Sequence, residues 1–188
     1  MNSKPIEPII EDAVILATEE GHEYVTVEHV MLSLFDDEKI IKLCEELKIE
    51  RGNIQEDLTQ YLKDNDWNGL LTQNGVKGTP KKTAAVERII QRSIAQVVFS
   101  GRTDIKPLDI FISVLHEEDS LSKYYCELNG LDKDLIIDHL ENKFRSGKST
   151  ELLQEYTKNL NQQAVLGKVP QKKWKQPQMT IILSYFYW

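Results

Sequence analysis

Four histidines and two cysteines are the residues of this chain best suited to bind a metal or act as nucleophiles. His22 and His29 lie seven positions apart with an expected turn between them, so their imidazoles could come close together. Zinc needs three or four converging ligands, and only Glu23 or Glu28 stands nearby to help. We therefore expect no metal site, with His29 packing in a helix and His22 solvated in a loop.

The remaining candidates for nucleophilic or metal chemistry are isolated from one another. Cys44 and Cys126 occur in apolar helical contexts, outside any CxxC motif or Cys/His cluster, which predicts two buried, reduced thiols. His139 falls on an apolar helical face and is expected to be a hydrogen-bonded core histidine. No Gly-x-Ser-x-Gly or Cys/His arrangement is present, so the sequence predicts no catalytic residues.

The segment RSGKST at 145–150 resembles part of a phosphate-binding loop. A true P-loop requires glycine at the position of Asn142, and it follows a β-strand, whereas the preceding segment has a helical pattern. No strand pattern alternates with the helices, so we expect no parallel sheet and no nucleotide or other cofactor. The segment is interpreted as the beginning of a flexible linker.

Charge and hydropathy exclude several classes of function. The net charge of −7 and the pI of about 5.2 argue against general nucleic-acid binding, which depends on Lys and Arg. No apolar run reaches the ~20 residues of a membrane span, and the N-terminus lacks a secretory signal pattern. We expect a cytoplasmic protein that binds neither nucleic acid nor membrane. The acidic turns 36–38 and 117–119 are expected to begin the third and seventh helices.

An internal repeat organises the domain that we assign to residues 1–146. Residues 9–62 and 86–144 follow the same plan, with Gly21 and Leu32 matched eighty positions later by Gly101 and Ile112. Each half has the apolar periodicity of four helices. The sequence therefore predicts an all-α domain of two four-helix repeats related by a pseudo-twofold axis.

Capping residues mark where these helices begin, and a connector separates the halves. Thr26, Thr83 and Asp132 are expected helix N-caps, and Pro107 suits a first helical position. The connector, 64–83, is rich in Gly and Asn and is predicted to be a mobile loop. Its Trp67 either forms part of a recognition surface or folds back over the domain.

Two segments carry a resemblance to a known family. They are GHEYVTVEHVMLSLF, from residue 21, and VERIIQRSIAQVVFSGRTDI, from residue 86. In order and at this separation they resemble the N-terminal Clp repeat of AAA+ protein unfoldases, most closely the ClpA type, over about residues 7–146. The resemblance implies a binding domain that stands on a flexible linker above a hexameric ATPase ring.

The remaining residues, 147–188, are assigned to a linker and a divergent tail. YTKNLNQQAVLGKVPQ, from Tyr156, resembles the beginning of the first ATPase module of the same family. The chain then departs into KKWKQPQMTIILSYFYW, whose last eight residues are strongly hydrophobic. We expect a truncated product, such as a frameshift would give; the alternative is a short protein with an anchoring tail. The resemblance implies contact with a Clp peptidase only through ATPase modules that this chain lacks.

For the ClpA type, the resemblance implies docking of a small ClpS-type adaptor, or of protein substrates directly. The matching docking positions, in the loop after the first helix and at the start of the second repeat, are His22, Glu23, Thr26, Thr83 and Arg88. Glu23 would accept charge-assisted hydrogen bonds from an adaptor, and Arg88 would form the complementary pair. The isolated domain is expected to be a monomer and to have no enzymatic activity.

Two alternatives remain open. ClpC-type domains, by resemblance, bind phosphoarginine through one acidic residue in each repeat, and we match these to Glu28 and Asp109. The neighbourhood of Lys106, Pro107 and Leu108 departs from the Gly-Thr-Glu-His pattern usual there. Alternatively, a domain without its ATPase could act as a decoy that occupies the adaptor by mass action.

Overall fold

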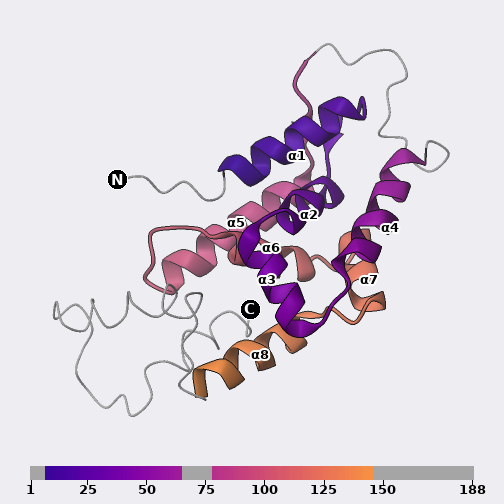
Figure 1. The fold of residues 1–188 in the computed structure, drawn as a ribbon. Coiled ribbons are helices and arrows are strands. Elements are labelled where there is room, and N and C mark those ends of the chain that lie inside the picture. The colour runs from indigo at the N-terminus through magenta and orange to yellow at the C-terminus, as the bar shows by residue number, and fades with distance from the viewer. Residues whose placement is uncertain (1–6, 65–77, 146–188) are drawn as a thin grey trace.

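Helices account for most of the described residues, 7–64 and 78–145, of the computed structural model (Figure 1). The first repeat comprises α1 (Glu7–Glu19), α2 (Val27–Phe35), α3 (Glu38–Leu47) and α4 (Arg51–Lys63). The second comprises α5 (Ala84–Phe99), α6 (Pro107–Leu115), α7 (Leu121–Leu128) and α8 (Lys133–Arg145). The prediction of an all-α fold built from two four-helix repeats is confirmed.

Matching residues end and begin the helices of the two repeats. Gly21 and Gly101 follow α1 and α5 with φ of 75° and 70°, a left-handed conformation that glycine adopts without a Cβ clash. Thr26 occupies the N-cap of α2, and Pro107 is the first residue of α6, as predicted. Asp132 accepts a hydrogen bond from the backbone N–H of Leu135 (2.8 Å) and so caps α8, also as predicted.

The acidic turns were only half correctly predicted. Asp37 caps α3 by accepting from the backbone N–H groups of Lys39 and Ile40, at 2.9 and 3.3 Å. In the second repeat Ser120, not an acidic residue, caps α7 by accepting from Lys123 N–H (3.1 Å). Glu117 instead turns back toward α5, because two arginines on that helix bind its carboxylate.

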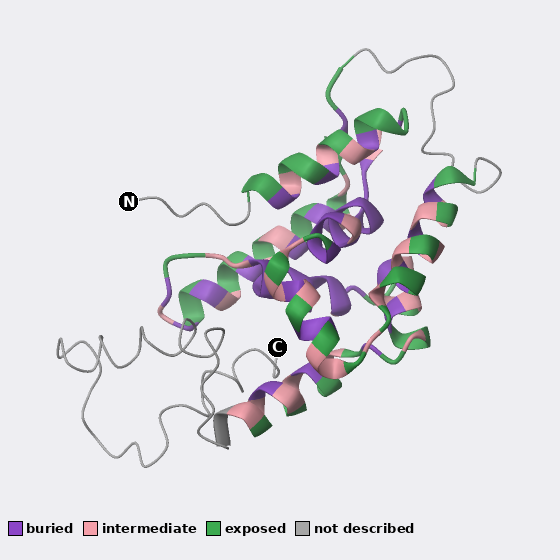
Figure 2. Cartoon of the chain, viewed as in Figure 1, coloured by how far each residue is buried: buried purple, intermediate pink, exposed green. Residues whose placement is uncertain are grey.

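The core lies around α2 and α6, which are buried over nearly their whole length (Figure 2). Both helices are apolar on almost every side, which is the pattern of a helix surrounded by protein. Phe35 and Phe111 meet edge to face between them, with ring centroids 5.9 Å apart. The surrounding helices cover this pair and expose their other faces to solvent.

A short parallel ladder joins the two repeats and corrects the expectation that no parallel sheet forms. β1 (Tyr24–Val25) pairs with β2 (Lys81–Lys82), in the register Tyr24 to Lys81 and Val25 to Lys82. Lys81 N–H donates to the Glu23 carbonyl (2.9 Å), and Thr83 N–H donates to the Val25 carbonyl (3.1 Å). The last residues of the predicted connector loop are therefore fixed against the first repeat.

A polar contact also joins α8 to the first repeat. Glu46 on α3 accepts a hydrogen bond from His139 (3.1 Å) and forms an ion pair with Lys143. His139 is thus hydrogen-bonded as predicted, although it is half-buried at the surface rather than in the core. Cys44 and Cys126 are buried and unlinked, as predicted, and burial raises the pKa of Cys44 to about 11.

Several predictions fall on residues outside the described ranges. These are the central part of the connector with Trp67, residues 146–150 of the RSGKST segment, and the tail to residue 188. Within the described residues, no helix combines the length and the apolar character needed to cross a membrane.

Candidate partner-docking site

The β1–β2 ladder brings two of the predicted docking residues, Glu23 and Thr83, onto one edge of the domain. Both side chains are half-buried. The Glu23 carboxylate has no hydrogen bond or ion pair within the described residues, while its backbone carbonyl is held by Lys81 N–H. A half-buried carboxylate on a fixed backbone, without a partner among the described residues, is available to a cationic group of a partner protein.

Thr83 serves the fold as well as this edge. Its hydroxyl oxygen accepts from the backbone N–H of Val86 (3.4 Å), which makes Thr83 the N-cap of α5 as predicted. Its backbone N–H is the last donor of the ladder. Thr83 therefore fixes where the second repeat begins relative to the loop that carries Glu23.

Arg88 is held within the domain by an ion pair that the sequence did not reveal. It binds Glu117 together with Arg92, whose guanidinium lies 3.1 Å from the other carboxylate oxygen. The Arg88 side chain is 56% exposed, whereas that of Glu117 is only 8% exposed. Burial raises the pKa of Glu117, but hydrogen bonds from the two arginines outweigh burial and leave that pKa below its usual value. Arg88 thus has an exposed side, and part of its hydrogen-bonding capacity is already used.

The other two predicted docking residues are buried, which contradicts the prediction of a solvated His22. His22 and Thr26 are only 2% and 6% exposed. His22 Nδ1 lies 2.8 Å from His29 Nε2, so the proximity expected from their spacing is confirmed. These side chains act from beneath the surface, by holding the loop that presents Glu23.

The hydrogen bonds around His29 define its tautomer. Its Nδ1 accepts from the backbone N–H of Thr26 (3.1 Å), so its ring proton belongs on Nε2, facing Nδ1 of His22. A proton on both nitrogens of His29 would break the bond to Thr26. Burial, followed by the neighbouring His22, lowers the pKa of His29 to about 4. The pKa of His22 is also lowered, chiefly by burial. Both imidazoles are therefore neutral at pH 7.

The second repeat uses a charged pair at the same two positions. Eighty positions after His22 and His29 stand Arg102 and Asp109, whose side chains are 3% and 0% exposed. Arg102 donates two hydrogen bonds to the Asp109 carboxylate, at 2.6 and 3.1 Å. Asp109 also accepts from the backbone N–H of Lys106 (2.8 Å), as His29 accepts from that of Thr26. Each pair therefore fastens the glycine turn to the start of a central helix.

This equivalence corrects the matching of Glu28 with Asp109. Glu28 is the second residue of α2, and the second residue of α6 is Leu108, so the second repeat has no acid at that position. Burial raises the pKa of Asp109, and Arg102 and the Lys106 N–H act in the opposite direction. Both oxygens of the Asp109 carboxylate already accept hydrogen bonds from the Arg102 guanidinium, so they are not available to the guanidinium of a ligand. Glu28, by contrast, has no partner within the described residues and is 8% exposed.

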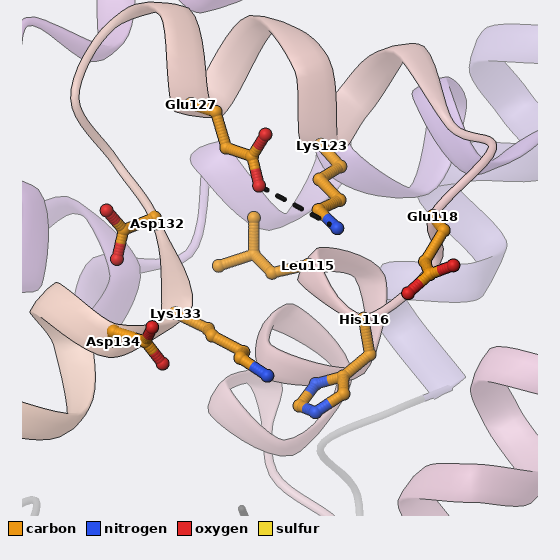
Figure 3. A pocket seen from close by; sticks show the side chains of 8 residues that line it. All are labelled: Leu115, His116, Glu118, Lys123, Glu127, Asp132, Lys133 and Asp134. Carbon is orange, nitrogen blue, oxygen red and sulfur yellow. Dashed lines mark ion pairs between the residues drawn. The ribbon is translucent and has the colours of Figure 1, made fainter.

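A polar pocket at the α6–α7 turn brings together side chains of both charges (Figure 3). Lys123 pairs with Glu127 along α7, at 3.7 Å, and Lys133 extends toward the ring of His116. Burial is the main cause that lowers the pKa of His116. Among the described residues, no group of three His, Cys, Asp or Glu side chains has the geometry to hold a metal ion.

Comparison with known proteins agrees with this architecture. The double repeat of four helices, with its central helices fastened by buried pairs, defines a class of all-α domains. The family model for the Clp repeat (R) N-terminal domain matches residues 1–129. The chain belongs to this family.

A protein whose sequence is similar to this chain agrees with the family assignment. A ClpA homolog protein from Fuscovulum blasticum is 29% identical over 126 residues, which cover 66% of this chain and 16% of that protein. The chain therefore matches about a sixth of its relative's length.

Solved structures show likeness of fold alone. The Hsp104 N-terminal domain from Candida albicans superposes with a TM-score of 0.60 at 15% identity, covering 71% of this chain and 85% of that one. The N-terminal domain of the ClpV1 ATPase from E. coli gives 0.53 at 16% identity, covering 68% and 76%.

Proposed function

We propose that this chain is a docking module of a Clp-type unfoldase system, which binds a ClpS-type adaptor or protein substrates and has no catalytic activity of its own. The observation that carries the proposal is the partnerless carboxylate of Glu23 on an edge where the backbones of both repeats are fixed. Family membership supports the general role. The adaptor, the cytoplasmic setting and the monomeric state are parts of the proposal.

In this proposal, Glu23 accepts hydrogen bonds from a lysine or arginine of the partner. Such a bond contributes about 1.5–3 kcal/mol where the partner excludes water. Thr83 and the exposed side of Arg88 complete the contact, while His22 and Thr26 hold the loop from beneath. The domain would serve an ATPase ring when joined to one, and would act as a decoy for the adaptor when alone.

The test is a calorimetric titration of the full chain with a ClpS-type adaptor. Glu23→Gln keeps the size of the side chain and removes its charge, so we expect about a tenfold or greater loss of affinity. Glu45→Gln is the matched control, because Glu45 is an exposed glutamate on α3 without a partner within the described residues. Equal affinities for the two variants, or no binding by the folded wild-type chain, would contradict adaptor docking at this edge.

A second candidate function rests on Glu28. Its carboxylate is buried and has no partner within the described residues, so it suits a guanidinium group. Burial is the main cause that raises the pKa of Tyr61, and the negative charge of Glu28 raises it further, which shows that the two side chains are near each other. Phosphoarginine recognition would then use the first repeat only. A phosphoarginine peptide should bind the wild-type chain and not Glu28→Gln, whereas Glu23→Gln should leave that binding unchanged. Loss in both variants would point to one shared site.

A further inference from the structure

The end of α5 carries an uncharged apolar surface that nothing in the described structure covers. Ile94, Val98 and Phe99 are 44%, 66% and 80% exposed, and Ala95 between them is exposed as well. The opposite side of the same helix is buried, through Val97 among others. We call Ile94, Val98 and Phe99 the α5 patch. In a chain of which 28% is charged, three neighbouring exposed apolar side chains indicate a binding surface.

The size of the α5 patch restricts what can occupy it. Three side chains with these exposed fractions present an area on the order of a few hundred Å². A stable interface between two proteins buries about 800 Å² on each partner. A second copy of the chain packed only on this patch would therefore bind weakly. A short apolar peptide held nearby by a covalent connection needs far less area, because its effective concentration is in the millimolar range.

The chain itself contains such a peptide. Residues 181–188 read IILSYFYW, and seven of these eight residues are aliphatic or aromatic. The 35 residues between positions 146 and 180 connect it to α8. A chain of 35 residues without secondary structure would have an end-to-end distance of roughly 30 Å, which is enough to reach any side of a domain of this size. In Figure 1 the end of α8 and the end of α5 lie toward the same side of the molecule.

Charge favours the same occupant. Residues 146–188 contain six lysines and two glutamates, which give a net charge of +4. Since the whole chain has a net charge of −7, residues 1–145 have a net charge of −11. Lys172, Lys173 and Lys175 lie six to nine positions before the apolar peptide, and Asp104, five positions after Phe99, is exposed. We propose that residues 181–188 dock on the α5 patch of their own chain, with the preceding lysines facing the acidic domain.

Tryptophan fluorescence of the full chain tests this directly. The three tryptophans, Trp67, Trp174 and Trp188, all lie outside the described residues, so Trp67→Phe and Trp174→Phe leave Trp188 as a reporter of the apolar peptide. We expect its emission to be blue-shifted and protected from iodide quenching, without change on hundredfold dilution. Emission typical of a solvated indole would overturn the proposal. A shift that disappears on dilution would assign the surface to a second copy instead.

A matched pair of substitutions locates the docking surface. In the same background, Val98→Asp should shift Trp188 emission to the red, because it places a charge in the centre of the α5 patch. Leu128→Asp is the control, because Leu128 on α7 is 64% exposed against 66% for Val98. Both side chains are largely solvated, so both variants should fold, as their helical circular dichroism will verify. Equal responses of the two variants, or a response to Leu128→Asp alone, would exclude the α5 patch.

Discussion

Two residue pairs of opposite character perform one task in the two repeats. His22 with His29, and Arg102 with Asp109, connect a glycine turn to the backbone N–H that precedes a central helix. The neutral pair avoids the desolvation of charge but depends on both imidazoles remaining unprotonated. The charged pair requires each ion to be compensated by the other, because both are buried. The two repeats should therefore respond differently to mutation and to pH.

Asp109→Asn should destabilise the domain by about 3–5 kcal/mol, because it leaves the buried Arg102 guanidinium uncompensated. Urea unfolding followed by circular dichroism measures this loss. Glu46→Gln is the comparison, since the side chains of Glu46 and its partner Lys143 are 26% and 20% exposed, and it should cost only about 1 kcal/mol. Replacing both members, as Arg102→Met with Asp109→Leu, should cost less than Asp109→Asn. If Asp109→Asn cost no more than Glu46→Gln, the buried pair would not hold the turn.

Because His29 is buried as a neutral imidazole, the free energy of unfolding should decrease as the pH is lowered. Its pKa is about 4 when folded and 6.5 in the unfolded chain, so only the unfolded state gains this proton between those values. The contribution is complete above pH 6.5 and is lost as pH falls toward 4, about 3 kcal/mol in total. His29→Asn keeps an acceptor for Thr26 N–H but does not titrate. The free energy of unfolding of this variant should therefore change less between pH 7 and 4.5 than that of wild type. Identical pH dependence would show that His29 does not titrate in this way.

At the scale of the element, the start of α5 depends on one hydroxyl. Thr83→Ala removes the acceptor for the Val86 N–H and should destabilise the domain by about 1 kcal/mol, whereas Thr83→Ser should be close to wild type. The midpoint of thermal unfolding measures both. Thr103→Ala is a control at an exposed threonine that caps no helix. A loss for Thr103→Ala as large as that for Thr83→Ala would show that the cap contributes nothing particular.

Helix limits were predictable because their signals are local. Glycine turns, threonine caps and the proline at the start of α6 each act within a few residues, so the sequence places them correctly. The β1–β2 ladder was missed because two residues per strand give no alternating pattern, and its strands are more than fifty positions apart. The repeat offset of eighty contained the signal for the equivalent pairs, since it matches His22 with Arg102 and His29 with Asp109. The resemblance to ClpC-type domains instead led us to match Asp109 with Glu28, which the structure does not support.

The exposure of the proposed docking residues was predicted correctly only in part. The resemblance selected Glu23, Thr83 and Arg88, and these do have exposed or half-buried side chains. Burial of His22 and Thr26 follows from packing against α2, which a linear pattern does not reveal. The attachment of Arg88 to Glu117 joins residues 29 positions apart, so it also required the folded chain.

At the scale of the whole molecule, the two repeats share one core rather than two. Phe35 of α2 packs on Phe111 of α6, the β1–β2 ladder pairs the backbones, and Glu46 joins α3 to α8. A four-helix unit of about 60 residues buries a limited apolar area by itself. Each repeat therefore depends on the other for much of its stability, and the domain should unfold in one cooperative step.

Phe111→Ala tests this dependence. The side chain is fully buried between the repeats, so its removal should cost about 3–5 kcal/mol, against less than about 1 kcal/mol for Tyr124→Ala at a ring that is 55% exposed. Native-state hydrogen exchange supplies the decisive measurement. The amides that exchange most slowly in the first repeat should lose as much protection from exchange as those in the second repeat, although the substitution lies in α6 of the second repeat. Loss confined to α5–α8 would show two independently stable repeats, and the shared core would then be only a contact between them.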